Sequence, residues 1–348
     1  MNIEKTVCYQ YLDTNLVINS ESVSAVDKIG QFLSPYFESI QESNGSADFV
    51  INLYDGGYPG AIPWIEKGTP CFIRKSAKPF FTRPAFQFTH NGCHAVKSKK
   101  SGAIFLFYDN KVDIFRGTSD DAFMDVVELI RDTVFKQQKN DQVLILHSTV
   151  VSKAGQATLI IGKKGAGKST LALDLVLNHG FQFVSGDKAF VTKDKGHLVV
   201  SGWPDYPHLG VGTFQGQPEL ANLLEFDVNQ YADSQEKVAI NPMRFKKVIP
   251  HGAQVHRLPI CQLVFPQVAC AAEGGEVRTQ SCLDLLRENI EEPFGAKAQW
   301  NPSVIASAAD VSDLLEGLDQ INAVDVRGRS TSAYIGLLNG GECHHENA

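Results

Sequence analysis

The chain has 348 residues, which exceeds one average domain and suffices for two. Hydrophobic residues make up 43% of it and charged residues 20%, so the composition is that of a globular protein with ample material for a core. The formal net charge of −7 argues against nucleic acid as a main partner.

The cysteine pattern and the lengths of the apolar runs indicate the cellular compartment of the protein. The 7 cysteines include no Cys-x-x-Cys pair, a pattern that suits a reducing environment better than a disulfide framework. Residues 1–5 do not begin a signal-peptide pattern, and no apolar run approaches the ~20 residues that a membrane-spanning helix needs. We therefore expect a cytoplasmic protein without a membrane partner, and assembly into a homo-oligomer stays open.

Residues 1–138 are expected to form an α+β domain, whose role the sequence does not indicate. Apolar residues recur at helical spacing over 23–34 and over 121–137. Strands are expected at 9–19, 48–53, 71–74, 85–88, 104–108 and 112–115. Asp109 and Asn110 would form the hairpin turn between the last two strands.

Residues 139–340 are expected to form a second and larger domain, of the α/β class. Strands are expected at 143–151, 158–161, 181–184, 198–200 and 260–266, and helices at 171–177, 283–291 and 304–317. In an α/β sheet the carboxyl ends of the strands face the ligand.

The stretch from Gly162 to Thr170 is the most informative one, because it matches the phosphate-binding loop pattern G-x-x-x-x-G-K-[ST] at every fixed position. The candidate nucleotide-binding residues are Gly162, Lys163, Lys164, Gly165, Ala166, Gly167, Lys168, Ser169 and Thr170. Glycines allow the backbone to approach a phosphate, and the loop N–H groups point at the anion. Lys168 would reach the β- and γ-phosphates, and the Ser169 hydroxyl would ligate Mg²⁺. The alternative, a glycine-rich turn that only opens a helix, is disfavoured by the strand before the loop and the helix after it.

Phosphoryl transfer also needs a carboxylate near the metal or the attacking group. Asp187 fits this role and that of a Mg²⁺ ligand, because it follows the strand expected after the loop helix. His147 ends the strand before the loop and is a second candidate. The alternatives are a turn residue for Asp187 and a structural hydrogen-bonding residue for His147.

The region from His147 to Asp187 resembles HPr kinase/phosphorylase. The residues that carry the likeness are 146–151, 162–170 and 183–187. In that family, whose nucleotide fold is shared with phosphoenolpyruvate carboxykinase, a strand with a histidine precedes the phosphate loop, and an Asp-Asp pair ends the strand after the loop helix. The likeness continues more weakly to about residue 320. This weaker part includes Lys237-Val238 and Arg257, which loosely matches a family arginine. Gly186 and Ser148 depart from the pattern, since the family has Asp and Gly there.

The resemblance implies a P-loop, HPr-kinase-like domain that acts as a kinase with ATP and Mg²⁺. The acceptor would be a hydroxyl of a peptide, protein or small molecule, and the expected catalytic residues are His147, Lys168, Asp187 and Arg257. Either His147 or Asp187 would orient or deprotonate that hydroxyl. The alternative, which Gly186 favours, is a nucleotide-binding sensor or maturation partner without transferase activity. A GTPase and a transporter ATPase fit less well, because the chain has no Asn-Lys-x-Asp and no Leu-Ser-Gly-Gly motif.

Overall fold

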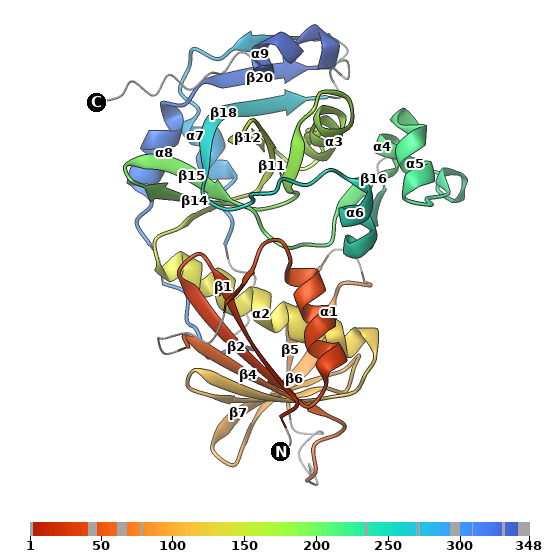
Figure 1. Ribbon diagram of the computed structural model, residues 1–348, viewed down its shortest axis with the longest axis vertical. Helices are drawn as coiled ribbons and strands as arrows, with labels where there is room; N and C mark the ends of the chain where they lie inside the picture. Colours follow the sequence, from red (N-terminus) through yellow and green to blue (C-terminus); the bar gives the residue numbers. More distant parts are fainter. Residues whose placement is uncertain are drawn as a thin grey trace. The chain divides into compact units, whose positions relative to one another are not determined.

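The computed structural model describes residues 3–40, 47–60, 68–76, 79–233, 236–268, 270, 272–292, 300–307, 309–328 and 331–339. These residues form a mixed α/β structure with two large sheets (Figure 1). Contacts divide the chain into two compact units. Unit 1 comprises Met1–Asp141 and Glu292–Ala309, and unit 2 comprises Gln142–Glu291 and Asp310–Ala348. Within the described ranges, no helix combines the length and the apolar character that crossing a membrane requires.

The segment 292–309 belongs to unit 1, although the sequence pattern predicts it within the second domain. The helix predicted at 304–317 is correspondingly wrong at its start. It begins only at Ser312, where the Asp310 carboxylate accepts a hydrogen bond of 3.0 Å from the Ser312 N–H group. A side chain that competes for a backbone donor in this way sets the helix boundary.

Unit 1 is built on one sheet with two helices packed against it. The described strands are β1 (Lys5–Tyr11), β2 (Thr14–Ser20), β3 (Glu38–Ile40), β4 (Phe49–Asp55), β5 (Thr69–Arg74), β6 (Arg83–His90), β7 (Cys93–Ser98), β8 (Ile104–Tyr108) and β9 (Lys111–Arg116). They lie in the order β3-β1-β2-β4-β9-β8-β7-β6-β5, and the helices are α1 (Val23–Leu33) and α2 (Asp120–Asn140). Ser22 and Ser119 begin the two helices, because each hydroxyl accepts a hydrogen bond from an N–H group of the first turn.

The strand predicted at 9–19 is wrong, because these residues form a hairpin. Leu12 takes a positive φ of 50°, which lets the chain reverse between β1 and β2. The strands β3 and β7 have no counterpart among the predicted elements. β7 pairs with β6 across a turn at Asn91 and Gly92, both of which have positive φ. The turn at 109–110 between β8 and β9 is confirmed.

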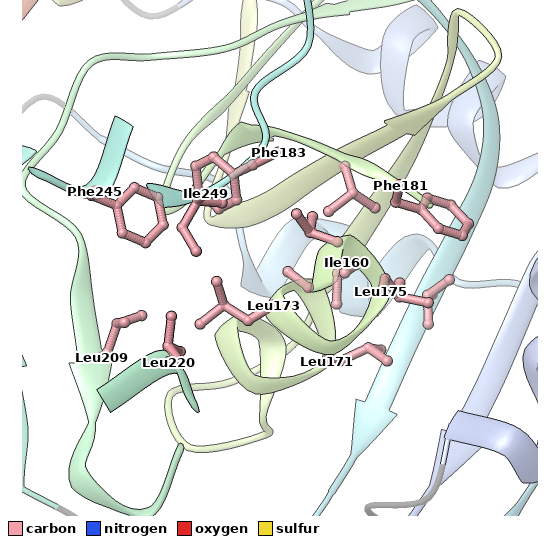
Figure 2. Close-up of a cluster of buried hydrophobic side chains, with 14 of the residues drawn as sticks. Ile160, Leu171, Leu173, Leu175, Phe181, Phe183, Leu209, Leu220, Phe245 and Ile249 are labelled. Atoms are coloured by element: carbon pink, nitrogen blue, oxygen red, sulfur yellow. The ribbon is translucent and has the colours of Figure 1, made fainter. Parts of the chain in front are cut away.

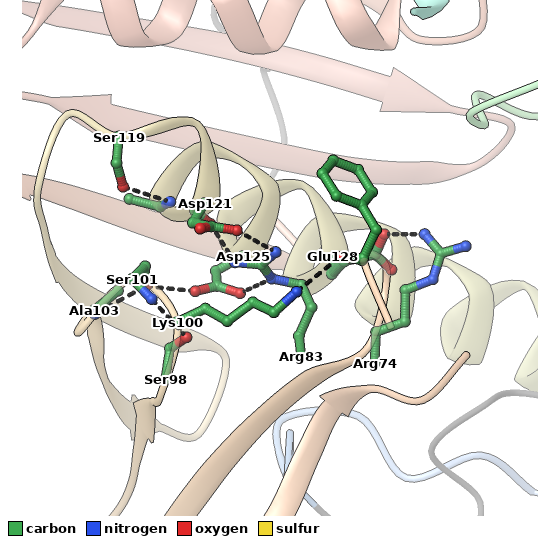
Figure 3. A network of polar contacts seen from close by, with 12 residues as sticks. Arg74, Arg83, Ser98, Lys100, Ser101, Ala103, Ser119, Asp121, Asp125 and Glu128 are labelled. Atoms are coloured by element: carbon green, nitrogen blue, oxygen red, sulfur yellow. Dashed lines mark hydrogen bonds and ion pairs between the residues drawn. The ribbon is translucent and has the colours of Figure 1, made fainter. Parts of the chain in front are cut away.

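Charged side chains are buried on α2 and form ion pairs with the sheet (Figure 3). Arg83 of β6 is fully buried and contacts Asp125 through Nε and Asp121 through Nη1, the latter at 2.9 Å. The Ser101 hydroxyl donates a hydrogen bond of 2.5 Å to the other oxygen of Asp125. Because both oxygens of the buried Asp125 carboxylate have donors, the network holds α2 on the sheet by directional contacts as well as by apolar packing.

Unit 2 is built on a second sheet, with strand order β10-β14-β15-β18-β12-β11-β13. β20 pairs with β18 and β19 pairs with β20, while β16 and β17 form a separate two-stranded sheet. The described strands are β10 (Leu144–Leu146), β11 (Ser148–Lys153), β12 (Gln156–Ile161), β13 (Gln182–Ser185), β14 (Ala189–Asp194), β15 (His197–Ser201), β16 (His208–Gly210), β17 (Lys237–Ala239), β18 (Leu258–Gln267), β19 (Gly274–Val277) and β20 (Ala323–Arg327). The helices are α3 (Lys168–Asn178), α4 (Val211–Gly216), α5 (Pro218–Leu223), α6 (Pro242–Val248), α7 (Leu283–Glu288), α8 (Ser312–Asp319) and α9 (Ile335–Asn339), with short 3-10 turns at Val228–Gln230 and Thr331–Ala333.

The helix α3 lies in a large apolar cluster of unit 2 (Figure 2). Its side chains Leu171 and Leu175 belong to one cluster with Ile160 of β12 and Phe183 of β13. Phe245 of α6 joins the same cluster, so the segment inserted between β15 and β18 is also packed there. Each large apolar side chain buried in this way stabilises the fold by roughly 1.5–3 kcal/mol. The cluster therefore fixes α3, and with it the loop that leads into α3.

Two further predicted elements of unit 2 differ from the structure. The strand predicted at 143–151 is interrupted at His147, and its halves, β10 and β11, lie in different parts of the sheet. The helix predicted at 283–291 ends at Glu288. Residues 289–291 instead pair with β10 through backbone hydrogen bonds.

We expect Asp125→Ala to lower the free energy of unfolding by about 3–5 kcal/mol, because it leaves the fully buried Arg83 without its buried partner. The matched control is Asp120→Ala, which removes the exposed pair with Lys28 and is expected to change stability by at most about 1 kcal/mol. Urea-induced unfolding followed by circular dichroism measures both. Equal effects of the two substitutions would contradict a structural role for the buried network.

Candidate functional site at the phosphate loop

Strand register brings separate parts of the chain together at one end of β12. The pair β10–β14 and the pair β11–β13 share one register as far as Val150, beyond which the register shifts. His147 therefore comes opposite the turn that holds Asp187 and Lys188. On its other side β11 pairs with β12, and that register puts His147 next to Gly162, where the phosphate loop begins. The predicted residues His147 and Asp187 and the start of the loop are therefore brought to one place.

The loop needs glycine at two positions for different reasons. Gly167 precedes α3 with a left-handed φ of 99°, and a Cβ atom there would lie 2.3 Å from the side chain of Val268. Gly165 has a φ of 90°, but the space around it is open. The first N–H groups of any α-helix lack a partner within the helix, so the start of α3 can bind an anion together with the loop.

Lys168 is folded back into the loop. Its Nζ donates a hydrogen bond of 2.5 Å to the carbonyl oxygen of Gly162. Burial, together with the positive charge of Lys237, lowers the pKa of Lys168 to about 8, although Asp187 and Glu291 act in the opposite direction. A phosphate anion beside Nζ would favour the charged form.

Lys237 is a cation near the loop that was not predicted as a site residue. It lies on β17 and pairs with Gly210 of β16. The adjoining helix α4 is tied to α3, because the hydroxyls of Thr213 and Thr170 lie 2.9 Å apart. The inserted segment thus brings a second positive charge towards Lys168, and only its fold reveals this.

Beside the loop, His147, Asp187, Lys188 and Glu291 form a closed group of alternating charges, which we call the corner cluster. Nδ1 of His147 lies 3.3 Å from Asp187 and 3.2 Å from Glu291. Nζ of Lys188 lies 3.2 Å from Asp187 and 3.4 Å from Glu291. The two carboxylates raise the pKa of His147. Burial alone would raise the pKa of Asp187, but Lys188 and His147 outweigh it and hold that pKa well below its usual value.

Glu291 is a site residue that the sequence analysis missed. It lies far from the loop in sequence, at the end of a segment whose pattern predicts a helix. In the structure its N–H group donates a hydrogen bond of 2.8 Å to the carbonyl oxygen of Ile145, and the N–H group of His147 donates one of 2.7 Å to that of Asn289. No motif marks this segment, so only its pairing with β10 identifies Glu291.

The remaining predicted residues lie in different places. Ser169 is in the first turn of α3. Gly186 offers no side chain to the site, and its carbonyl oxygen accepts a hydrogen bond of 2.9 Å from the Thr149 hydroxyl. Arg257 directly precedes β18 and is exposed, nine positions before Pro266, which lies against the loop. Since a strand rises ~3.3 Å per residue, Arg257 is about 30 Å from the loop along β18. The structure therefore does not bring Arg257 to the phosphate loop.

The groups at the loop fit a magnesium nucleotide. The N–H groups of the loop and of the start of α3, together with Lys168, form a cradle for phosphates. Among the described residues, no group of three or more His, Cys, Asp and Glu side chains forms a metal site by itself. A magnesium ion held by Ser169 and Asp187 would complete its shell with phosphate and water oxygens, as Mg²⁺ does in many nucleotide sites.

Comparisons with known proteins add no family assignment. A scan of the sequence against protein-family models gives no match, and a search of curated proteins gives none either. The function proposed below rests on the sequence motif and on the geometry of the site.

We expect Gly167→Ala to lower the free energy of unfolding by about 2–5 kcal/mol, because alanine would bear both the positive φ and the clash with Val268. Gly165→Ala is the matched control, since it bears only the positive φ and should cost about 1–2 kcal/mol. Urea-induced unfolding of the two variants gives the difference. If Gly167→Ala were no more destabilising than Gly165→Ala, the close packing of Val268 on the loop would be refuted.

Proposed function

We propose that unit 2 is a P-loop nucleotide-binding domain of the HPr-kinase-like type and that the chain is an ATP-dependent kinase. One observation carries this proposal, namely the strand register that sets His147 and Asp187 beside a loop with the phosphate-binding pattern. A phosphate loop alone supports nucleotide binding, whereas a carboxylate and a histidine beside it support transfer of the γ-phosphoryl group. The proposed acceptor is a hydroxyl of a peptide, protein or small molecule.

Each residue has a definite part in this proposal. The loop N–H groups and Lys168 bind the phosphates and stabilise the negative charge of the transition state. Ser169 and Asp187 hold Mg²⁺, which neutralises charge on the phosphates when bound. His147 orients the acceptor hydroxyl or accepts its proton, while the carboxylates of the corner cluster face its Nδ1 atom.

A nucleotide-binding sensor or maturation partner without transferase activity is the second candidate. Gly186 favours it, because a glycine stands next to Asp187 where the resembling family has a further carboxylate. Both candidates use the same loop, so nucleotide binding does not separate them. Binding of Mg·ATP with no phosphorylated product in any substrate mixture would support the sensor.

We expect Lys168→Ala and Asp187→Ala each to reduce phosphoryl transfer by roughly 100-fold or more, because each removes a charge that stabilises the transferring phosphoryl group. Incubation of a cell extract with the full chain and γ-labelled ATP, followed by mass spectrometry, identifies the labelled acceptor and measures the rate. Circular dichroism checks that the variants are folded.

The matched control is Lys153→Ala, at the far end of β11, where the exposed lysine donates a hydrogen bond to the carbonyl oxygen of His179. This substitution removes one positive charge from β11 without changing the phosphate loop, so we expect phosphoryl transfer at the wild-type rate. Retained transfer in Lys168→Ala or Asp187→Ala would contradict the roles proposed for these residues.

A further inference from the structure

Two carboxylates compete for the same ring nitrogen of His147. Nδ1 lies 3.3 Å from Asp187 and 3.2 Å from Glu291, and it carries at most one hydrogen. Lys188 also contacts both carboxylates, so Asp187 and Glu291 share the same two partners. Neither contact has hydrogen-bond geometry in the structure, where Nδ1 is buried without a hydrogen-bond partner among the described residues. Because both carboxylates lie within ion-pair distance, either one can accept the hydrogen bond of Nδ1 after a small side-chain adjustment when the other moves away.

The two carboxylates differ in how freely they can move. The side chain of Asp187 is 43% exposed and lies in the turn between β13 and β14, directly after Gly186. The side chain of Glu291 is 27% exposed, and its backbone is tied to Ile145 of β10. Glu291 is thus the fixed partner of the ring, and Asp187 is the one that can turn outward.

We propose that Glu291 is a positioning residue for His147, whose carboxylate accepts a hydrogen bond from the Nδ1–H group of the ring when Asp187 turns to a magnesium nucleotide. The binding of Asp187 to a magnesium nucleotide rests on the proposed kinase function, whereas the contact between Glu291 and His147 does not. With Nδ1 as the donor, Nε2 keeps its lone pair and can accept a hydrogen bond from an acceptor hydroxyl. Lys188 stays paired with Glu291, so that carboxylate keeps both of its partners.

The tautomer of His147 tests this role without nucleotide. It is read from the nitrogen-15 chemical shifts of the two ring nitrogens in histidine-labelled full-length protein, with His147→Gln used to assign the signals. We expect Nδ1 to stay protonated in Asp187→Ala, because Glu291 suffices to hold the ring. It should also stay protonated in Glu291→Gln, whose side-chain carbonyl oxygen can accept the same hydrogen bond. The double variant Asp187→Ala/Glu291→Ala should lose this tautomer, and its loss in Asp187→Ala alone would overturn the proposal.

Addition of magnesium and ADP distinguishes the role of Glu291 from that of Asp187. In this state we expect Glu291→Ala to lose the Nδ1–H tautomer while the wild type keeps it. Turnover of ATP should fall roughly 10- to 100-fold, as for other residues that orient a reacting group, and the affinity for ADP should stay within about twofold. A retained Nδ1–H tautomer in Glu291→Ala with magnesium and ADP bound would overturn the proposal.

Glu292→Gln is the matched control, because it removes the adjacent carboxylate, which is exposed and pairs with Lys139 of α2. We expect wild-type turnover and an unchanged His147 tautomer in this variant. If the wild type binds neither ADP nor ATP, the kinase proposal fails, but the nucleotide-free comparison still decides the role of Glu291. If nucleotide binds and the tautomer responds to neither carboxylate, Glu291 is not the positioning residue and the kinase proposal stands.

Discussion

The register that continues from β10 into β11 is the constraint on which the candidate site depends. Because side chains alternate along a strand, a slip of one residue would turn His147 to the opposite face of the sheet. Backbone pairing of β10 with β14, and of β11 with β12 and β13, prevents that slip. The segment 289–291 adds backbone hydrogen bonds to Ile145 and His147. The chemistry proposed for this corner therefore rests on main-chain pairing, and only secondarily on the side chains themselves.

The charged side chains at the site already have polar partners within the protein, and a bound nucleotide would replace some of these contacts. Lys168 donates to a carbonyl oxygen of its own loop, and Asp187 is shared between His147 and Lys188. A bound phosphate would take over Lys168, and a bound metal would take over Asp187. Because Glu291 makes the same contacts as Asp187, the corner cluster can release one carboxylate without leaving His147 and Lys188 unpaired. This redundancy links the geometry of the corner cluster to the arrangement in which transfer would occur.

The sequence predicted those parts of the site whose chemistry is local. The loop from Gly162 to Thr170 is recognisable because its glycines and Lys168 act within one strand–loop–helix unit, and His147 and Asp187 are recognisable as strand ends. Glu291 and Lys237 were not predicted as site residues, because long-range pairing places them near the loop. The interruption of the predicted strand 143–151 was missed for the same reason. Its residues are apolar apart from His147, Ser148 and Thr149, and the two halves are distinguished by their different partner strands.

The most direct test of the central claim is a crystal structure of the full chain with magnesium and a non-hydrolysable ATP analogue. The account predicts that the γ-phosphate contacts Lys168 and the amides of the loop, with the metal between Ser169 and Asp187. It also predicts that the Nε2 atom of His147 faces the γ-phosphate while Nδ1 remains on Glu291. A nucleotide bound away from this loop, or one whose γ-phosphate points away from His147, would contradict it.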